Sequence, residues 1–541
     1  MKVNGDDRRE EERRDRFDRG GADSPSSARL SQPSPMRNLS SAAGGLYVSA
    51  PGKIILFGEH AVVYGKTAIA GSIDLRTYVS LFTSADGRIY LSLPDLGVEK
   101  TWMLKDLLKA GERLASEYPV DDSQPPSLEL LVPLARKLSG SCEEQCGVQH
   151  LAILAFWYVL LGVAHRKSAD KLVFSSGDGE SEVTTRCSSS SSMDLLAVKT
   201  TVRFELPSCV GLGSSGAYCV CIVTALLQSS GLIPPPSIAD SDGNLTWEDE
   251  HLDMIRKWAA AAESLIHGRA SGLDAAVCTY GGVASFKPGT RIEHLKNLPD
   301  LRVILVNTKV ERNTSRMVQC VKERMKQFPK VVDGVFNTID EISLRAAGIL
   351  GKPSCTENGE PETSAPPTPI LNGGGGTVTN DLDHRSLQPT CGSVRSASLS
   401  SYISAGKRDS CASAISGCST KGELIDTFTK LNDLCRINNQ LLIALGVGHP
   451  KVDQICTLLA RYGIHPKMTG AGGGGSVFAF LKPDTPTTLL EMITNELMKL
   501  GYDVWQPPLG GPGVIEHARR PALFSSAPTS STHSTPSIHH K

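Results

Sequence analysis

The sequence PSCVGLGSSGA, at residues 207–217, runs directly into the apolar segment YCVCIVTALL at residues 218–227. The glycines and serines predict a loop, and the apolar run predicts a buried helix. Where a loop enters a helix, unpaired backbone N–H groups and the positive end of the helix dipole attract an anion. The segment therefore predicts a phosphate-binding loop, although a glycine- and serine-rich helix cap without a ligand has the same pattern.

Four residues of this loop suit phosphate binding. Gly211 and Gly213 have no side chain, so the backbone can approach a phosphate closely. Ser214 and Ser215 supply hydroxyl groups that can bond to phosphate or bind Mg²⁺. We therefore expect these residues to lie against a phosphorylated ligand.

A second glycine-rich segment, KMTGAGGGGS at residues 467–476, precedes the apolar strand VFAFL. Glycine costs conformational entropy and contributes no buried side chain, so core packing does not explain these glycines. They indicate close approach of the backbone to a ligand or to another part of the chain. A flexible linker is the alternative, and the apolar strand directly after the glycines argues against it.

Two carboxylates lie in the segment ESLIHGRASGLDAAVCTYGG, at residues 263–282. Glu263 is expected on a helix, and Asp274 follows a Ser-Gly turn where another helix can begin. Beside a phosphate loop, one carboxylate can hold Mg²⁺ while the other handles an acceptor hydroxyl. Read alone, Asp274 is equally compatible with a helix cap.

The first ordered segment contains SAPGKIILFGEH, at residues 49–60, which predicts a β-rich run, a Gly/Pro turn and then small residues. Lys53 is a candidate site cation or a surface lysine, and His60 is a candidate ligand or a core or capping histidine. The overlapping GEHAVVYGKT, at residues 58–67, ends like a P-loop. His60 stands where GxxxxGKT requires its first glycine, so this segment is not a Walker A motif.

Taken in order, these four segments resemble the superfamily of galactokinase, homoserine kinase, mevalonate kinase and phosphomevalonate kinase. Its three signature regions correspond to APGK at 50–53, PSCVGLGSSG at 207–216 and KMTGAGGGGS at 467–476. Within the superfamily, VSAPGKIILFGEHAVVYGKTAIAGSIDLRT, IHGRASGLDAAVCTYGG and NTKVERNT look like the mevalonate kinases. The resemblance covers most of residues 46–517. It implies two α+β domains with the active site in the cleft between them, and a nucleotide loop unrelated to the P-loop.

Three positions depart from the family pattern. Gly216 stands where the family usually has Ala, Ser208 where a second Pro is common, and Ser476 where Cys is frequent. None of these changes removes a functional group. Glycine in the first helical turn can lower the stability of that turn by up to about 1 kcal/mol.

The resemblance also implies a role for each site residue. Asp274 would accept the proton of the acceptor hydroxyl, with Lys53 against both groups, and Ser215 and Glu263 would hold Mg²⁺. The phosphates of ATP would lie on the loop residues, which are Gly211, Leu212, Gly213, Ser214, Ser215 and Gly216. Besides Lys53 and Asp274, the candidate substrate-site residues are Glu59, His60, Ser271 and Thr308.

The reaction implied by the resemblance is transfer of the ATP γ-phosphoryl group to the C5 hydroxyl of mevalonate. Its product, 5-phosphomevalonate, serves isoprenoid and sterol precursor synthesis. Feedback inhibition by isoprenoid diphosphates and a homodimer are implied as well. The alternatives are another kinase of the superfamily, such as galactokinase or phosphomevalonate kinase, and a non-catalytic sensor that binds nucleotide or ligand on the same fold. The joint presence of Lys53, Ser215, Glu263 and Asp274 argues against the sensor.

Composition limits the expected partners and compartment. The 541 residues include 56 basic and 57 acidic side chains, so no global charge attracts nucleic acid or an anionic membrane. The first residues lack an apolar run typical of a secretion signal, and 14 cysteines without such a signal suit a reducing compartment. We expect a cytoplasmic protein; the terminal IHHK is not an SKL signal, but partial peroxisomal residence stays open. The helical spacing of Cys142, Cys146 and His150 favours apolar thiols on a helix face over a metal site.

The pattern of apolar and low-complexity segments predicts two domains, at residues 45–292 and 293–520, and the resemblance implies that both are kinase domains. Tails at 1–44 and 521–541 are expected to be disordered, and low-complexity inserts are expected at about 168–193 and 352–420. The apolar run at 151–164, too short to span a bilayer, predicts a buried core helix. Apolar periodicity predicts further helices at 247–267, 312–328, 331–350, 421–445 and 451–462, and strand-like segments lie at 77–83, 89–93 and about 198–206.

Overall fold

The computed structural model describes residues 39, 44–121, 123–140, 147–175, 197–207, 210–239, 243–268, 270–311, 313–351 and 419–525. The expected tails and inserts fall mostly outside these residues. Cys142 and Cys146 also lie outside them, so the alternative of a metal at these two cysteines has no structural description. Ser208 lies outside the described residues as well.

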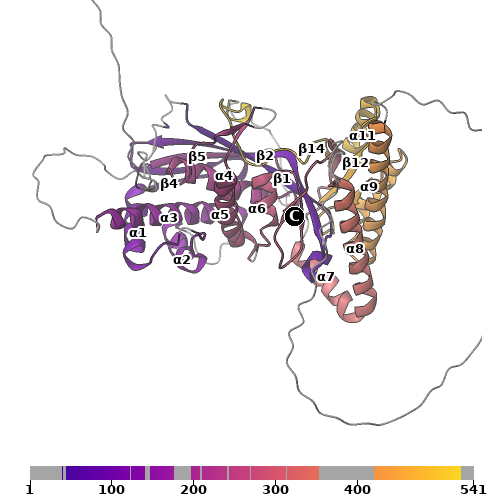
Figure 1. Cartoon of the computed structure of the whole chain (residues 1–541), viewed down its shortest axis with the longest axis horizontal. Coiled ribbons are helices and arrows are strands. Elements are labelled where there is room, and N and C mark those ends of the chain that lie inside the picture. The colour runs from indigo at the N-terminus through magenta and orange to yellow at the C-terminus, as the bar shows by residue number, and fades with distance from the viewer. Residues whose placement is uncertain are drawn as a thin grey trace, which may run out of the picture.

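Fifteen strands of the described chain form one sheet that runs through the molecule. They are β1 (Leu46–Phe57), β2 (Ala68–Ser84), β3 (Arg88–Leu93), β4 (Val98–Met103), β5 (Ala197–Phe204), β6 (Ile238–Ala239), β7 (Leu245–Thr246), β8 (Val283–Phe286), β9 (Glu293–His294), β10 (Leu301–Asn307), β11 (Lys467–Met468), β12 (Ser476–Leu481), β13 (Asp503–Trp505), β14 (Pro508–Leu509) and β15 (Ile515–Glu516). The main path has the order β11-β12-β10-β14-β2-β1-β15-β7-β6. The short strand β14 therefore connects the C-terminal strands to the long pair β1 and β2 (Figure 1).

The strand β1 corrects one expectation from the sequence. A turn was expected at the Pro-Gly step, but β1 continues from Leu46 to Phe57 and pairs antiparallel with β2 along its length. The register shifts between Pro51 and Gly52, as it does at a β-bulge. Because the strand continues past this irregularity, Lys53 is held within a buried β-ladder.

Six helices of the described residues pack on the N-terminal part of the sheet (Figure 1). They are α1 (Leu104–Glu117), α2 (Leu128–Ser139), α3 (Val148–Ser175), α4 (Ser214–Ser229), α5 (Asp249–His267) and α6 (Leu273–Tyr280). The core helix expected from the sequence is confirmed as α3, in which Phe156, Trp157 and Tyr158 are buried. This helix extends to Ser175, so the chain is still helical where the first insert was expected to begin, at about residue 168.

The length of α3 also corrects the membrane argument. The apolar run alone was expected to be too short, but the stretch Val148–Asp170 is long and apolar enough to cross a bilayer by length and composition. In the structure, 78% of its apolar window is buried inside the protein. Such burial is typical of the core helix of a globular domain.

Five further helices in the described part of the chain cover the C-terminal strands. The first four confirm the helical segments expected at 312–328, 331–350, 421–445 and 451–462, with small shifts at their ends, whereas the fifth was not predicted from the sequence. They are α7 (Thr314–Gln327), α8 (Pro329–Leu350), α9 (Ser419–Ala444), α10 (Pro450–Ala460) and α11 (Thr487–Lys499). Figure 1 shows α8 and α9 side by side at the right of the molecule, where the two helices contact each other.

The largest apolar core spans the expected domain boundary. It includes Val303 and Leu305 of β10 together with side chains of the N-terminal helices. The two expected domains therefore share packing across residues 292 and 293, and the boundary itself stays a prediction.

The second glycine-rich segment packs against other parts of the chain. A Cβ atom on Gly473 would lie 2.5 Å from Met317 Sδ, and one on Gly474 would lie 2.6 Å from Val310 Cγ1. Both contacts are shorter than real Cβ atoms show, so glycine is what allows this approach. Of the explanations offered by the sequence, close approach to another chain segment is the one that these contacts support.

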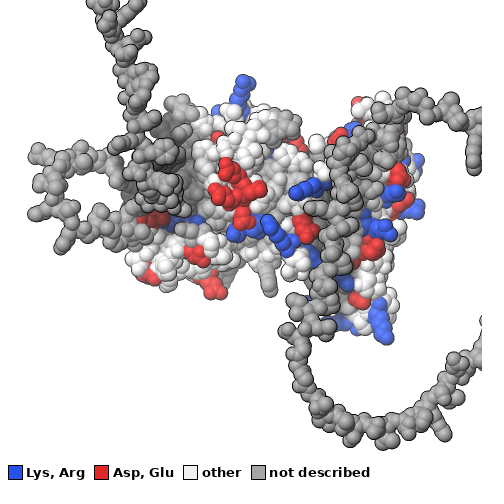
Figure 2. Space-filling view, viewed as in Figure 1, with Lys and Arg blue, Asp and Glu red and all other residues white. Residues whose placement is uncertain are grey.

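The surface carries charges of both signs. On the face shown in Figure 2, basic and acidic side chains are interspersed between uncharged residues. This distribution agrees with the nearly equal numbers of basic and acidic residues in the sequence.

Candidate active site

A cavity of about 280 Å³ opens at the phosphate loop identified in the sequence. One part of its wall is polar, formed by side chains of β1, α4, α5, α6 and α7. The rest is apolar, formed by α3, the end of β5 and the 3₁₀ turn Pro94–Leu96. The lining residues are Lys53, Leu96, Val148, Leu151, Ala152, Phe204, Gly211, Gly213, Ser214, Ser215, Tyr218, Ile266, His267, Asp274 and Thr314.

The phosphate loop ends where α4 begins. Gly213 is the N-cap of α4 with φ at 71°, a left-handed conformation that glycine adopts without strain. A Cβ atom there would also lie 2.8 Å from Lys53 Cγ. The carbonyl oxygen of Leu212 accepts a hydrogen bond of 2.9 Å from the backbone N–H of Lys53. The loop is therefore fixed to β1, and the first residues of α4 line the cavity.

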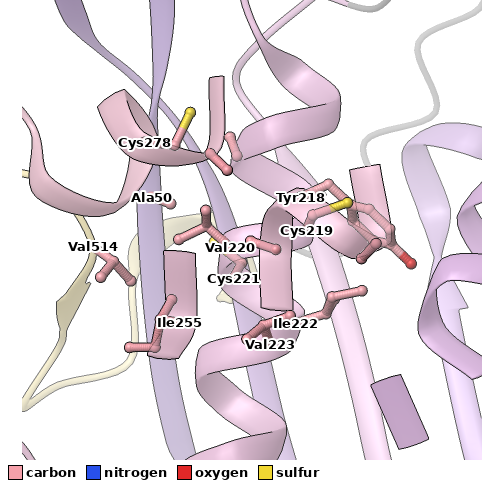
Figure 3. Packing of buried hydrophobic residues seen from close by; sticks show 14 of the residues in the cluster. Ala50, Tyr218, Cys219, Val220, Cys221, Ile222, Val223, Ile255, Cys278 and Val514 are labelled. Carbon is pink, nitrogen blue, oxygen red and sulfur yellow. The ribbon is translucent and has the colours of Figure 1, made fainter. Parts of the chain in front are cut away.

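The helix α4 is anchored by the main apolar core. Figure 3 shows its side chains Val220 and Cys221 in one cluster with Cys278 of α6 and Ala50 of β1. Burial raises the pKa of the Cys221 thiol to about 12, and it raises the pKa of Cys278 well above the usual range of a thiol. These cysteines are therefore packing groups with little thiolate, and they hold α4, α6 and β1 together around the cavity.

Lys53 and Asp274, selected from separate motifs, meet at the cavity wall. Lys53 Nζ lies 3.0 Å from Asp274 Oδ1, and the Asp274 side chain is 25% exposed. Asp274 stands in the first turn of α6, whose N-cap is Gly272. Asp274 is therefore not a helix cap, and the capping alternative from the sequence does not hold. A carboxylate that faces a cavity beside a cation can accept a proton from a hydroxyl group.

The second carboxylate, Glu263, lies deeper than Asp274. Its side chain is buried, and Ser215 Oγ donates a hydrogen bond of 3.3 Å to Glu263 Oε1. Burial, and secondly the negative charge of Asp274, raise the pKa of Glu263 to about 8, while Lys53 and the Ser215 hydroxyl act in the opposite direction. A buried carboxyl whose charge is so poorly compensated fits a divalent cation, and its oxygen atoms with the Ser215 hydroxyl are the ligands that Mg²⁺ prefers.

The lining residues that the sequence analysis did not select include His267 and Thr314. His267 Nε2 lies 2.9 Å from Ser215 Oγ, and Thr314 lines the cavity at the N-terminus of α7. His267 follows Glu263 by four residues on α5, so helical spacing would have placed both on one face. Thr314 ends the same NTKVERNT motif from which Thr308 was selected, and the motif alone does not show which threonine faces the cavity.

Comparison with known proteins shows the family of this chain. The family model described as "GHMP kinases N terminal domain" matches residues 184–282, and "GHMP kinases C terminal" matches residues 424–499. The mevalonate kinase of Bos taurus is 33% identical over 472 residues, covering 87% of this chain and 95% of that protein. The chain belongs to the mevalonate kinase family. The mevalonate kinase of Homo sapiens is also 33% identical, with the same coverage of both chains. The crystal structure of the Methanococcus jannaschii mevalonate kinase is 18% identical with a TM-score of 0.49, covering 86% of this chain and 99% of that one.

Membership of the mevalonate kinase family confirms the α+β two-domain kinase fold expected from the sequence. The local structure also argues against a P-loop at residues 58–67. Ala61–Tyr64 form a 3₁₀ turn ended by Gly65, and Lys66 Nζ donates a hydrogen bond to Asn337 of α8. Lys66 is thus directed to a C-terminal helix and not to a phosphate.

In the described structure, four other residues expected at the substrate do not line this cavity. Glu59 pairs with Lys467 in the interior, and His60 Nε2 lies 2.9 Å from the carbonyl oxygen of Ala471. Burial lowers the pKa of His60. Thr308 is buried and donates to the Gly475 carbonyl, while Ser271 Oγ accepts from the Leu273 N–H at the start of α6. Each of the four has a structural contact, so their role as substrate contacts stays a prediction.

The departures from the family pattern have local consequences. A Cβ atom on Gly216 would lie 3.0 Å from Asp274 Cβ and 3.4 Å from Cys278 Sγ. An alanine at this position would therefore press on the residue whose carboxylate faces the cavity. Ser476 is buried and donates to the Val210 carbonyl, which fixes the start of the phosphate loop to β12.

Proposed function

We propose that this chain is a mevalonate kinase, which transfers the γ-phosphoryl group of ATP to the C5 hydroxyl of mevalonate and releases 5-phosphomevalonate. The observation that carries the proposal is the convergence of the phosphate loop and the Lys53–Asp274 pair at one cavity, with the buried Glu263 bonded to Ser215 of its lining. The 33% identical mevalonate kinases cover most of the chain and favour mevalonate over galactose or phosphomevalonate as the acceptor.

The residues divide the reaction between them. The backbone of residues 211–216 and the N-terminus of α4 bind the nucleotide phosphates, and the apolar wall with Leu96, Leu151 and Phe204 suits the adenine ring. Asp274 accepts the proton of the C5 hydroxyl as its oxygen bonds to phosphorus, and Lys53 balances the charge beside it. Because phosphoryl transfer depends mainly on alignment and charge neutralisation, the loop and Lys53 contribute more to rate than proton removal does.

Ser215 and Glu263 would hold the Mg²⁺ ion that accompanies ATP. Bound there, Mg²⁺ neutralises phosphate charge and supplies the compensation that the buried Glu263 carboxyl lacks. The protein's own contribution is a carboxylate and a hydroxyl held on two packed helices, α5 and α4.

One assay tests the proposed reaction. Purified full-length protein with ATP and Mg²⁺ should release ADP in the presence of mevalonate, and much more slowly with galactose or phosphomevalonate in its place. The product should be 5-phosphomevalonate by mass spectrometry. ADP release that depends on galactose or phosphomevalonate but not on mevalonate would overturn the proposal.

We further propose inhibition by isoprenoid diphosphates, a homodimer and a cytoplasmic location, with partial peroxisomal residence left open. The diphosphate of such an inhibitor suits the phosphate loop, and its hydrocarbon chain suits the apolar wall beside it. Competition between ATP and farnesyl diphosphate tests the first point. Light scattering of the purified protein tests the second, and imaging of the tagged full-length chain with a peroxisomal marker tests the third.

A further inference from the structure

Two polar side chains, Glu263 and His267, meet at the hydroxyl of Ser215. Ser215 Oγ lies 3.3 Å from Glu263 Oε1 and 2.9 Å from His267 Nε2. Glu263 and His267 are four residues apart on α5, which places them on one face of that helix. Ser215 stands in the first turn of α4, and the two helices pack against each other. All three groups are therefore carried by regular structure and not by loops.

The distances fit adjacent ligands of one metal ion. In an octahedral site with metal–ligand bonds of about 2.1 Å, neighbouring ligand atoms lie about 3.0 Å apart. The two distances to Ser215 Oγ are close to that value. The Ser215 hydroxyl oxygen thus lies at the distance of an adjacent ligand from both a carboxylate oxygen and an imidazole nitrogen.

We propose that His267 is a third protein ligand of the divalent cation, and that its nitrogen gives the site a preference for Mn²⁺ over Mg²⁺. This inference rests on the proposed function only in that the cation is the one that accompanies ATP. Imidazole suits transition metals, whereas Mg²⁺ favours oxygen ligands and keeps its water. Ser215 and Glu263 therefore provide the protein ligands for Mg²⁺, and His267 adds affinity mainly for Mn²⁺.

The competing explanation is an ordinary hydrogen bond. The single Ser215 hydrogen can be donated either to Glu263 or to His267. If Ser215 donates to Glu263, then an Nε2–H of His267 donates to Ser215 and only positions the hydroxyl. In that case no nitrogen touches the metal, whereas a ligating His267 presents the Nε2 lone pair and carries its proton on Nδ1.

Pulsed electron paramagnetic resonance separates the two explanations. The full-length enzyme would be prepared with natural or ¹⁵N-labelled histidine and loaded with Mn²⁺ and ADP. We expect electron spin echo modulation from a bound histidine nitrogen, changed by the ¹⁵N label and lost in His267→Asn. No histidine modulation, or modulation that persists in His267→Asn, would overturn the proposal.

The matched control is His251→Asn, a change on the same helix at a residue outside the cavity lining. His251 also lies with Glu248 and Glu250 in a surface group that can collect a metal ion, so this variant tests that source of a nitrogen signal. The modulation should be unchanged in His251→Asn. Modulation lost in His251→Asn but kept in His267→Asn would assign the nitrogen to the surface group and overturn the proposal.

Metal affinities give a second readout that does not depend on turnover. His267→Asn should weaken Mn²⁺ binding, measured from the free Mn²⁺ signal, by about tenfold or more. Mg²⁺ binding, measured by competition, should change by less than about threefold, because oxygen ligands dominate it. Equal losses for both metals would show a positioning role and overturn the selectivity. His267 is exposed, so its replacement is not expected to unfold the protein.

The same samples distinguish failure of this inference from failure of the proposed function. If mevalonate-dependent ADP release is normal and no nitrogen ligand is found, His267 is not a ligand and the kinase assignment stands. If His267 binds Mn²⁺ but mevalonate releases no ADP, the cation site stands and the proposed acceptor is wrong.

Discussion

Two lysine–carboxylate pairs involve neighbouring parts of the chain, Lys53 in β1 and Glu59 just after it, yet they lie in opposite surroundings. Lys53 and Asp274 are 3.0 Å apart at the cavity wall, with side chains 9% and 25% exposed. Glu59 and Lys467 are 1% and 0% exposed. Lys467 Nζ also lies 5.2 Å from the ring centre of Phe478. The first pair can reach a ligand, and the second is enclosed by protein.

The difference separates a reactive pair from a structural one. A carboxylate at a cavity can exchange its hydrogen bonds with a substrate hydroxyl, whereas an enclosed carboxylate can only hold the parts of the chain that carry it. Glu59 and Lys467 join the end of β1 to β11, so this pair ties the N-terminal strand to the C-terminal half. Residue type and motif do not reveal this difference, but exposure does.

The largest expected effect is on turnover at the accessible pair. Asp274→Asn should lower kcat by at least about 100-fold, because the amide cannot accept the hydroxyl proton and leaves Lys53 without its counter-charge. Thermal stability and nucleotide affinity should change little. Steady-state rates at saturating ATP and mevalonate, with calorimetry, provide the measurement.

A double mutant adds a check on the same pair. Lys53→Met alone should be similarly damaging, and the double mutant should lose much less than the product of the two single losses, since the pair acts as a unit. A near-normal kcat for Asp274→Asn would exclude Asp274 as the base.

In the enclosed pair, substitution should lower the stability of the protein more than its turnover. Glu59→Gln leaves the Lys467 cation buried without a counter-charge, which should lower the free energy of unfolding by about 3–5 kcal/mol. Under conditions where the variant is folded, kcat should fall much less than in Asp274→Asn. Urea unfolding and calorimetry measure the first effect, and turnover per folded molecule measures the second.

An exposed pair provides the control for that loss. Asp426→Asn breaks the Lys430–Asp426 pair on α9, whose side chains are 57% and 60% exposed, and should cost less than about 1 kcal/mol. If Glu59→Gln kept its stability but raised the KM for mevalonate, Glu59 would belong to the substrate site, as the sequence alone suggested.

The sequence was sufficient where the chemistry is local. The glycine–serine loop and the start of α4 were predicted from PSCVGLGSSGA, and Lys53, Glu263 and Asp274 were selected from short motifs. The structure brings all of them together, because β1, α4, α5 and α6 pack on one another. A motif of this kind specifies both a local conformation and a residue type, so the pattern alone is enough to predict the loop and to select the candidate residues.

The sequence was insufficient where a partner lies far along the chain. Nothing near Glu59 indicates that Lys467 meets it, since the contact depends on how β11 is placed by the sheet. The same limit applies to Thr314, which the sequence analysis did not select although it selected Thr308. Both are threonines of one motif, and only the position of α7 shows that Thr314 faces the cavity. The Pro-Gly turn was wrong for a related reason, because pairing with β2 carries β1 through that step.

A smaller effect tests how strongly turnover depends on the exact position of Asp274 in the accessible pair. Gly216→Ala adds a methyl group 3.0 Å from Asp274 Cβ, so the neighbouring residue must move by a few tenths of an ångström. We expect kcat, measured at saturating substrates, to fall by about 3- to 10-fold, since catalysis is sensitive to small displacements. Stability should rise slightly or stay level, because alanine favours the first turn of α4 by up to about 1 kcal/mol.

The matched control for that change is Gly334→Ala in α8. A Cβ atom at Gly334 meets no described neighbour within 4 Å, so this substitution should leave kcat unchanged. A Gly216→Ala enzyme with full kcat would show that Asp274 has room to adjust.

The last expected effect concerns Glu263, a buried carboxyl that has a hydroxyl partner where Glu59 has a lysine. Its pKa is about 8 in the folded protein and close to 4.5 when exposed, because burial and the charge of Asp274 disfavour ionisation. Between these values the folded state binds more protons than the unfolded state, so the free energy of unfolding falls as pH rises. This loss of stability is absent below about pH 4.5 and complete above about pH 8.

In EDTA, Glu263→Gln should therefore be more stable than the unmodified protein at pH 8, with the advantage shrinking towards about pH 5.5. Excess Mg²⁺ with ADP should remove the advantage at pH 8, because a bound cation compensates the ionised carboxylate. Thermal melts at both pH values measure this effect. A difference that does not change with pH in EDTA would mean that Glu263 is ionised without a cation, contrary to its buried surroundings.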